Sequence, residues 1–372
     1  MNNGKLMMVR RDRSASETTV QTARLLWEAC RPVIDEAAFR RVLDCGAAVP
    51  VAAAEATKHR LVGMLWRALR ATGTLDLLGP ERERFEGMAE SFRLEALLLI
   101  PSAVALAVQP LTDIGLEPVV FKGPAVARRY PELGLRPMDD IDVLLPPASH
   151  HEALAALQRA GWSIARPAGP DVYDTVLSHS EVPSLFLELH YGLEKKFERV
   201  TALDPESLWM RRRPIECAGT QAYGLSPADE MVVLAAHAGK RHHRFTRLIW
   251  IADLAMIAYA EKRAGTAVDW CAVHELAEEA GCLTVVGTAL SMARRAGVEV
   301  PGDLFRLPAR GWRGATIRCL TSESWPMSQL ELGNDRPLNY AIVDRLDQRL
   351  HLAMLAARYR FQQLQWSRRS IS

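Results

Sequence analysis

Residues 119–124 read VVFKGP and residues 135–145 read LRPMDDIDVLL. Both stretches contain a short apolar run that glycine or proline interrupts, a pattern typical of short buried strands. We therefore expect one strand to end at Phe121 and a second to run over residues 141–145. Pro124 lacks the N–H that a first helical turn leaves unpaired, so a short helix is expected over residues 124–130.

Two carboxylates stand at alternate positions beside the second strand. Side chains at i and i+2 of a strand project to the same side, about 7 Å apart, so Asp140 and Asp142 are expected to face one side together. Like charges this close raise each other's pKa unless a cation lies between them. Magnesium takes hard oxygen ligands and keeps coordination positions for phosphate oxygens, so the pair is a candidate magnesium site.

A third acidic residue lies on a later strand. Residues 184–190 read SLFLELH, and this alternation predicts that the three leucines face one side and Phe186, Glu188 and His190 the other. Glu188 would complete a metal clamp for in-line displacement at phosphorus. Each piece alone has an ordinary explanation: an isolated Asp-x-Asp is commonly a solvated strand edge, Lys122 a surface lysine, and Glu188 the polar face of an amphipathic strand. The order and spacing of the pieces favour a site.

This order resembles the nucleotidyltransferase superfamily typified by DNA polymerase beta, and more specifically a bacterial family of uncharacterised nucleotidyltransferases. The shared pattern covers roughly residues 95–285 and is specific in combination rather than in any single piece. Its pieces in this chain are Phe121-Lys122-Gly123, Tyr130-Pro131, Arg136-Pro137-Met138-Asp139-Asp140-Ile141-Asp142, Glu188-Leu189-His190, Leu225-Ser226-Pro227, His237-Ala238-Gly239-Lys240-Arg241-His242 and Leu248-Ile249-Trp250-Ile251-Ala252-Asp253-Leu254.

The resemblance implies roles for the matching residues. Asp140, Asp142 and Glu188 would bind the metal and carry catalysis, and Lys122-Gly123 would meet the nucleotide phosphates. Glycine allows the backbone to approach a phosphate closely, and an ammonium group offsets the charge of the triphosphate.

Arg136 has two roles open to it. Its guanidinium could grip the same phosphates with two hydrogen bonds, or it could form an ion pair with Asp139 or Glu132.

The chain also departs from the family pattern twice. It has Lys-Gly where the wider superfamily has Gly-Ser, which removes a hydroxyl contact to phosphate, and Asp139 stands where a glycine is frequent.

Several histidines raise the question of a zinc site. The spacing H-x-x-x-x-H-H places His237 and His242 on different faces of one helix, which disfavours zinc. We expect His237 to pack near a domain junction, and contact of His237 or His190 with the acceptor substrate is the alternative. Asp253, inside an apolar helix, is expected to be paired or to lie at a helix boundary.

Periodicity along the chain predicts an α+β fold that is mostly helical. A minimal polymerase-beta-like nucleotidyltransferase α/β core over residues 111–200 would be flanked by a helical region over 18–110 and a C-terminal helical domain over 201–372. Residues 1–17 are expected to form a flexible N-terminus.

Within these regions several finer elements are predicted. A helix is expected over residues 150–160, a third strand over 162–165, and an irregular, proline-rich excursion over 300–337. The further helices are expected over 231–238, 248–260, 270–280, 283–296 and 340–365. One apolar stripe of the N-terminal helical region comprises Leu94, Leu97, Leu98 and Ala105.

Composition excludes some classes of protein. The chain has 372 residues, of which 49% are hydrophobic and 24% charged, with a formal charge of +2. This balance fits globular domains and disfavours nucleic acid as a partner, so the basic runs at 211–213 and 240–244 are expected to be solvated faces. The six cysteines contain no C-x-x-C pair, and no P-loop motif is present.

The start of the chain has no apolar run long enough for a signal peptide, and the most apolar windows, 96–108 and 248–260, are short of the roughly 20 residues that cross a bilayer. We therefore expect a cytoplasmic protein without membrane partners.

These observations predict a magnesium-dependent nucleotidyltransferase, with Mn²⁺ as an alternative metal. It would move a nucleoside monophosphate from an NTP, with ATP favoured, to a hydroxyl or phosphate of a small molecule, saccharide, peptide or protein, and release pyrophosphate. The alternative is a non-catalytic nucleotide-binding sensor or interaction protein with the same fold.

Overall fold

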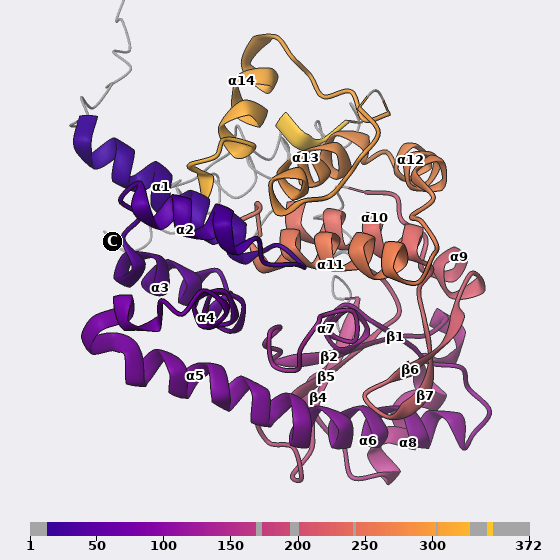
Figure 1. Cartoon of the computed structure of the whole chain (residues 1–372). Helices are drawn as coiled ribbons and strands as arrows, with labels where there is room; N and C mark the ends of the chain where they lie inside the picture. The colour runs from indigo at the N-terminus through magenta and orange to yellow at the C-terminus, as the bar shows by residue number, and fades with distance from the viewer. Residues whose placement is uncertain are drawn as a thin grey trace, which may run out of the picture.

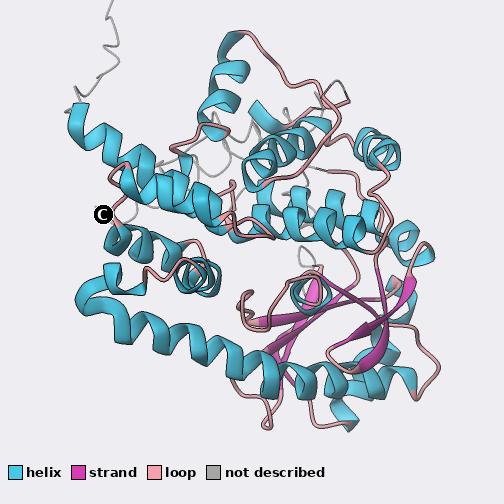
Figure 2. Ribbon diagram, viewed as in Figure 1, coloured by secondary structure: helices cyan, strands magenta, loops and turns pink. Residues whose placement is uncertain are grey.

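The computed structural model describes residues 13–168, 173–193, 201–240, 243–302, 304–327 and 341–344, with side chains from residue 17 onward. The fold is α+β and mostly helical, as the sequence predicts: one mixed sheet lies among helices on several sides (Figures 1 and 2).

Helices make up the N-terminal part of the described chain. The first four are α1 Arg13–Ala29, α2 Glu36–Asp44, α3 Val49–Lys58 and α4 Val62–Ala71. Because α1 begins at Arg13, residues 13–17 are helical rather than frayed, and the rest of the expected flexible N-terminus lies outside the described residues. A long helical run then follows, made of η1 Leu75–Glu81, α5 Arg82–Leu94, the π turn η2 Glu95–Leu99 and α6 Ile100–Thr112.

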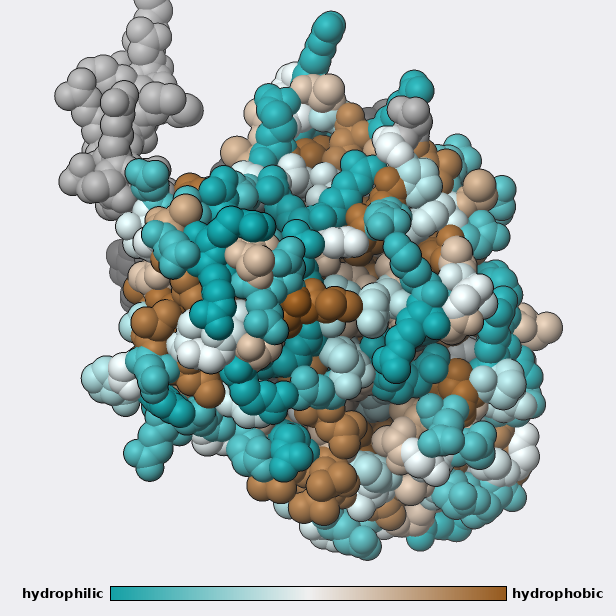
Figure 3. Space-filling model, in the orientation of Figure 1, coloured by the Kyte–Doolittle hydropathy of each residue, from teal (hydrophilic) through white to brown (hydrophobic). Residues whose placement is uncertain are grey.

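The π turn moves the apolar face of this helical run. Leu94, Leu97 and Leu98 are 46%, 50% and 61% exposed, so the predicted stripe does not form the buried face. A π turn contains one residue more than an α-helical turn and so rotates the side chains that follow it. The buried face lies instead beyond the turn, on Ile100, Ala103, Val104, Ala107, Val108 and Leu111. Figure 3 shows hydrophobic side chains gathered on the surface over α5 and α6.

Among the described residues, one helical run, Leu75–Thr112, is long and apolar enough to cross a membrane, by length and composition only. It is longer than the apolar window that the sequence alone indicates. A core helix passes the same test, and α6 packs its apolar face on the sheet as a core helix does.

In the part of the chain that the structure describes, seven strands form the sheet, in the order β3-β4-β5-β2-β1-β7-β6. The central strands β2 and β5 are parallel, and β1 pairs with β2 antiparallel and with β7 parallel. The strand bounds are β1 Val119–Phe121, β2 Asp140–Leu144, β3 Ser163–Arg166, β4 Asp174–Ser178, β5 Phe186–His190, β6 Arg213–Cys217 and β7 Thr220–Gly224.

Short helices connect the strands. The turn after β1 leads into α7 Gly123–Ala127, which has its proline in the first turn as expected. The other connections contain η3 Pro147–Ser149, α8 His150–Arg159 and α9 Pro205–Met210.

The C-terminal helices lie on the opposite side of the sheet from α6 and α8 (Figure 1). They are α10 Pro227–Gly239, α11 Ile249–Arg263, α12 Trp270–Glu279, α13 Leu283–Ala293, η4 Arg294–Ala296, α14 Gly311–Leu320 and η5 Trp325–Met327. The segment expected to be irregular therefore contains a helix, α14, between Pro308 and Pro326. Most of the helix expected over 340–365 lies outside the described residues.

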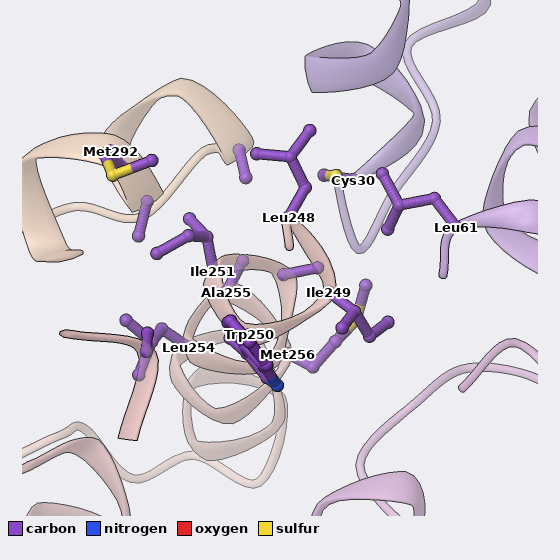
Figure 4. Close-up of a cluster of buried hydrophobic side chains, with 14 of the residues drawn as sticks. Cys30, Leu61, Leu248, Ile249, Trp250, Ile251, Leu254, Ala255, Met256 and Met292 are labelled. Carbon is purple, nitrogen blue, oxygen red and sulfur yellow. The ribbon is translucent and has the colours of Figure 1, made fainter. Parts of the chain in front are cut away.

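The N-terminal and C-terminal helices share one hydrophobic core. Buried residues of α1 to α4 belong to the same cluster as those of α10 to α13. Figure 4 shows part of it, where Cys30 and Leu61 lie near Leu248 and Ile249. Segments far apart in sequence therefore form one body around the sheet.

Two smaller cores cover the faces of the sheet. Residues of α6 and α8 pack on one face, against Ile141, Val143, Leu187 and Leu189. The opposite face carries Phe121 and Leu144, packed on Leu208 and Val233. The sheet itself continues to Gly224 through the β6–β7 hairpin, past the end of the predicted core at residue 200.

Candidate active site

The parallel pair β2 and β5 places the predicted acidic side chains on one face of the sheet. Asp142 is the register partner of Glu188, and Asp140 that of Phe186. Because side chains alternate along each strand, Asp140, Asp142 and Glu188 project to the same side, and His190 projects with them. Glu188 therefore lies on the side of the sheet that the sequence predicts.

Asp142 is the most enclosed of the three carboxylates. It is 2% exposed, and its Oδ1 accepts hydrogen bonds from Lys122 Nζ at 2.5 Å and from His190 Nε2 at 2.7 Å. Burial alone would raise the pKa of Asp142, but the charges and hydrogen bonds of Lys122 and His190 outweigh it and hold the pKa well below its usual range. Asp142 is thus a fixed carboxylate anion.

His190 joins the two strands at this point. Its Nε2 also lies 3.3 Å from Glu188 Oε2. Burial and the nearby Lys122 lower the pKa of His190, yet the hydrogen bonds to Asp142 and Glu188 outweigh them, so its pKa is raised. The histidine that the sequence offers as an acceptor contact is therefore part of the acidic cluster.

Ligand atoms of Asp142, Glu188 and His190 all lie within 4.8 Å of one another. Two carboxylates so close suit a divalent cation, with His190 as their hydrogen-bond partner. Asp140 is outside this tight group but lines the same cavity. Burial first, and then repulsion by Asp142, raise the pKa of Asp140 to about 6.

The Lys122-Gly123 turn holds the ammonium in place. Lys122 has φ 50° and ψ −121°, a strained conformation for a residue with a side chain. Its carbonyl oxygen accepts a hydrogen bond from Val126 N–H at 2.8 Å, which fixes the turn at the start of α7. A Cβ at Gly123 would lie 3.2 Å from the carbonyl oxygen of Asp140, so the close approach of the turn to β2 favours glycine.

Arg136 is held by a partner that the sequence did not indicate. Its guanidinium donates two hydrogen bonds to Asp253, Nε to Oδ1 at 2.8 Å and Nη2 to Oδ2 at 3.0 Å. The hydroxyl of Tyr130 donates to the same Oδ1 at 2.7 Å. Asp253 is therefore paired, as expected. The Tyr-Pro and Arg-Pro pieces of the motif each supply one side chain that donates hydrogen bonds to this buried carboxylate of α11.

The ion pairs expected for Arg136 are therefore wrong. Asp139 pairs with Arg60, and Glu132 pairs with Arg70 at 2.6 Å. Asp139 lines the mouth of the same cavity, and its side chain is 68% exposed. Both pairs connect the core to the N-terminal helices.

A wall of histidine, tryptophan and lysine side chains lies in the same cavity as the carboxylates. The ring of His237 lies 4.3 Å from that of His243 and 5.3 Å from that of Trp250, centroid to centroid. Burial, together with the charges of Lys122 and Lys240, lowers the pKa of His237 well below its ordinary value, so the ring is neutral. Its Nδ1 is buried and has no hydrogen-bond partner among the described residues.

Lys240 corrects the expectation of a solvated basic run. It is 8% exposed, and its Nζ donates to the carbonyl of Leu193 at 2.7 Å. Two residues of that run, 241 and 242, lie outside the described residues, and with them the predicted placement of His237 and His242 on different helix faces. In the other run, Arg211 pairs with Asp229, and Arg212 lies over the ring of Trp209.

The cavity that these groups line has a volume of about 310 Å³. Its remaining walls come from residues that sequence reasoning missed, notably Arg60, Arg166, Tyr173, Asp174 and Arg247. None of these five residues belongs to the motifs quoted from the sequence, and they reach the cavity through tertiary packing alone.

Comparison with known proteins agrees with this geometry. The family model described as "Uncharacterised nucleotidyltransferase" matches residues 49–296, a span that includes the acidic cluster, the Lys-Gly turn and the α10–α11 wall. Among curated proteins, none matches this chain. The chain belongs to the uncharacterised nucleotidyltransferase family, whose members are transferases of phosphorus-containing groups.

Proposed function

We propose that this protein transfers a nucleoside monophosphate from an NTP to an acceptor hydroxyl or phosphate in a reaction that depends on a divalent metal. The bond from the acceptor oxygen to the α-phosphorus forms as the bond from that phosphorus to the bridging oxygen breaks, and pyrophosphate leaves. The observation that carries the proposal is the register pairing of Asp142 with Glu188, with Asp140 on the same face.

Asp142, Glu188 and Asp140 are the residues that would hold the metal, for which Mg²⁺ is our first choice and Mn²⁺ the second. When bound, the metal would neutralise charge that develops on the phosphoryl oxygens. The chain itself supplies positioning. The Lys122 ammonium offers a charge-assisted hydrogen bond to a phosphate, and the turn at Gly123 lets the backbone come close.

A carboxylate of the cluster would take the proton that leaves the acceptor. We assign this role to Glu188, whose side chain is 26% exposed, rather than to Asp142, whose side chain is 3% exposed. The neutral ring of His237, on the opposite wall, is placed to contact the acceptor, and its buried Nδ1 is available for a hydrogen bond.

Arg136 has a smaller part in this scheme than the sequence suggests. It lines the cavity, but Asp253 already takes two of its hydrogen bonds. We propose that it supports the α11 wall and contributes positive potential at the phosphates rather than a bidentate grip.

Transfer of label tests the proposal. Each of four α-³²P-labelled NTPs, ATP being the one we favour, is incubated with the protein, Mg²⁺ and a fractionated lysate, and labelled products are identified by mass spectrometry. The proposal predicts metal-dependent labelling of one acceptor class, a small molecule, saccharide, peptide or protein, together with pyrophosphate release. Calorimetric binding of NTP without transfer to any fraction would favour the nucleotide-binding sensor instead.

A further inference from the structure

The ammonium group of Lys122 lies where the acidic cluster needs a cation. Its Nζ is 2.5 Å from Asp142 Oδ1, and its side chain is only 11% exposed. Asp142, Glu188 and Asp140 all act on this group electrostatically. Lys122 is thus the internal counter-ion of the same three carboxylates that are proposed to hold the metal.

A divalent cation and this ammonium cannot occupy the cluster together without a penalty. Asp142 Oδ1 already accepts two hydrogen bonds, from Lys122 and His190. A metal ion bound to that oxygen would lie within a few ångströms of the ammonium, and like charges repel strongly at such distances away from bulk water. A metal ion that binds this oxygen is therefore expected to displace Lys122 from Asp142.

The structure fixes the backbone of Lys122 and places its side chain at the wall of the cavity. The turn is held by the hydrogen bond to Val126 and by the packing of Gly123 against β2. The stem passes near the ring of Phe121, with Nζ 4.7 Å from the ring centroid, and the head faces the cavity. A triphosphate arriving there would offer the ammonium new anionic partners.

We infer that Lys122 closes the metal site to free divalent ions and opens it when a triphosphate draws the ammonium away from Asp142, so that metal and nucleotide bind cooperatively. This inference rests on the proposed function, because it takes the metal and the triphosphate as ligands of this cavity. It adds that the lysine acts as a placeholder cation before it acts as a phosphate ligand. Its signature is tighter binding of a divalent ion, in the absence of nucleotide, when Lys122 is replaced by a neutral residue.

Binding of Mn²⁺ without nucleotide, measured by electron paramagnetic resonance of the free ion at pH 8, tests the inference. Lys122→Gln and Lys122→Met remove the charge, and the methionine keeps an apolar stem beside Phe121. Both are expected to bind Mn²⁺ about tenfold or more tightly than the wild type, because the repulsive charge is gone. Lys122→Arg keeps the charge and should retain the weak binding of the wild type.

Arg166→Gln is the matched control for loss of one positive charge. Arg166 lines the same cavity but pairs with Asp174 at 2.6 Å. It should change nucleotide-free Mn²⁺ affinity much less than Lys122→Gln does. Circular dichroism checks that each variant is folded. If one of the two neutral variants at Lys122 fails to fold, the other carries the test.

The outcomes separate this inference from the proposed function. Water-proton relaxation reports whether the wild type binds Mn²⁺ together with a non-hydrolysable NTP. If it does, and neither neutral variant binds Mn²⁺ more tightly than the wild type in the absence of nucleotide, Lys122 is not a placeholder cation. The proposed function would still stand. An equal gain in Lys122→Arg would also overturn it, and absence of any Mn²⁺–nucleotide binding in the wild type would overturn the proposed function itself.

Discussion

Asp142 and Glu188 face each other as register partners on the parallel strands β2 and β5, and His190 Nε2 lies within 3.3 Å of an oxygen of each. One imidazole therefore joins a buried carboxylate, Asp142, to a partly buried one, Glu188, and two anions lie close together. Such an arrangement is costly unless cations compensate it. Lys122 does so in this structure, and a divalent metal would do so during catalysis.

Asp140→Asn is expected to lower nucleotidyl transfer by on the order of 100-fold or more, because it removes one anionic ligand while leaving the fold unchanged. The assay is transfer of labelled nucleotide at saturating metal. Asp76→Asn is the matched control, since that carboxylate lies in η1 outside the cavity, pairs with Arg82 and is 87% exposed. It should remain within a few-fold of the wild type, and equal losses in the two variants would contradict the assignment.

The pH dependence of stability gives a second prediction for Asp140, in the metal-free protein. Its pKa is raised from 3.8 to about 6 in the folded state, so the folded state binds the proton more tightly. Stability from this group is therefore greatest at low pH and is lost as the pH rises from about 4 to about 6. Urea unfolding should show that Asp140→Asn removes this loss, and an identical pH slope in both proteins would contradict it.

Gly123→Ala is expected to destabilise the protein by about 1–3 kcal/mol, because the new Cβ would press on the carbonyl oxygen of Asp140 at 3.2 Å. It should also weaken metal binding by displacing β2. Gly87→Ala is the control: no atom lies within 4 Å of that Cβ position in α5, so alanine should stabilise by about 0.5–1 kcal/mol. Denaturant titration measures both, and a neutral effect at Gly123 would show that the turn has room.

Arg136→Met and Asp253→Leu are each expected to cost about 3–5 kcal/mol, because each leaves an uncompensated buried charge. The double variant should recover much of that loss, which a double-mutant cycle in urea quantifies. This result would mark the pair as structural. If Arg136→Met instead leaves stability unchanged and only weakens NTP binding, the guanidinium is mainly a phosphate ligand.

The rotation at the π turn predicts two contrasting leucines. Leu98 is 61% exposed and Leu111 is fully buried. Leu98→Ala should change the free energy of unfolding by less than about 0.5 kcal/mol, whereas Leu111→Ala should cost about 2–5 kcal/mol. Similar losses at the two positions would mean that the helix buries the face the sequence suggests.

Local patterns were enough to predict the parts of the site that lie on single strands. The alternation in residues 184–190 predicts which side Glu188 takes, and the Asp-x-Asp spacing predicts that Asp140 and Asp142 share a face; the register of β2 and β5 agrees. These predictions succeed because strand alternation is a local rule.

The remaining features depend on contacts between distant segments or on turns without a strong signal. The partner of Arg136 is on α11, more than a hundred residues away, and the burial of Lys240 depends on Leu193 and Tyr173. The β6–β7 hairpin turns at Ala218-Gly219, with positive φ at both residues. Alanine there is a weaker hairpin signal than asparagine or aspartate, so the two strands escaped prediction.

The most direct test of the central claim is the anomalous diffraction of Mn²⁺ in crystals grown with a non-hydrolysable NTP. We predict one peak about 2.1 Å from carboxylate oxygens of Asp142 and Glu188, with the Lys122 ammonium moved from Asp142 to a phosphate. A nucleotide bound in the cavity with no peak at these carboxylates, or with the metal held elsewhere, would contradict the claim.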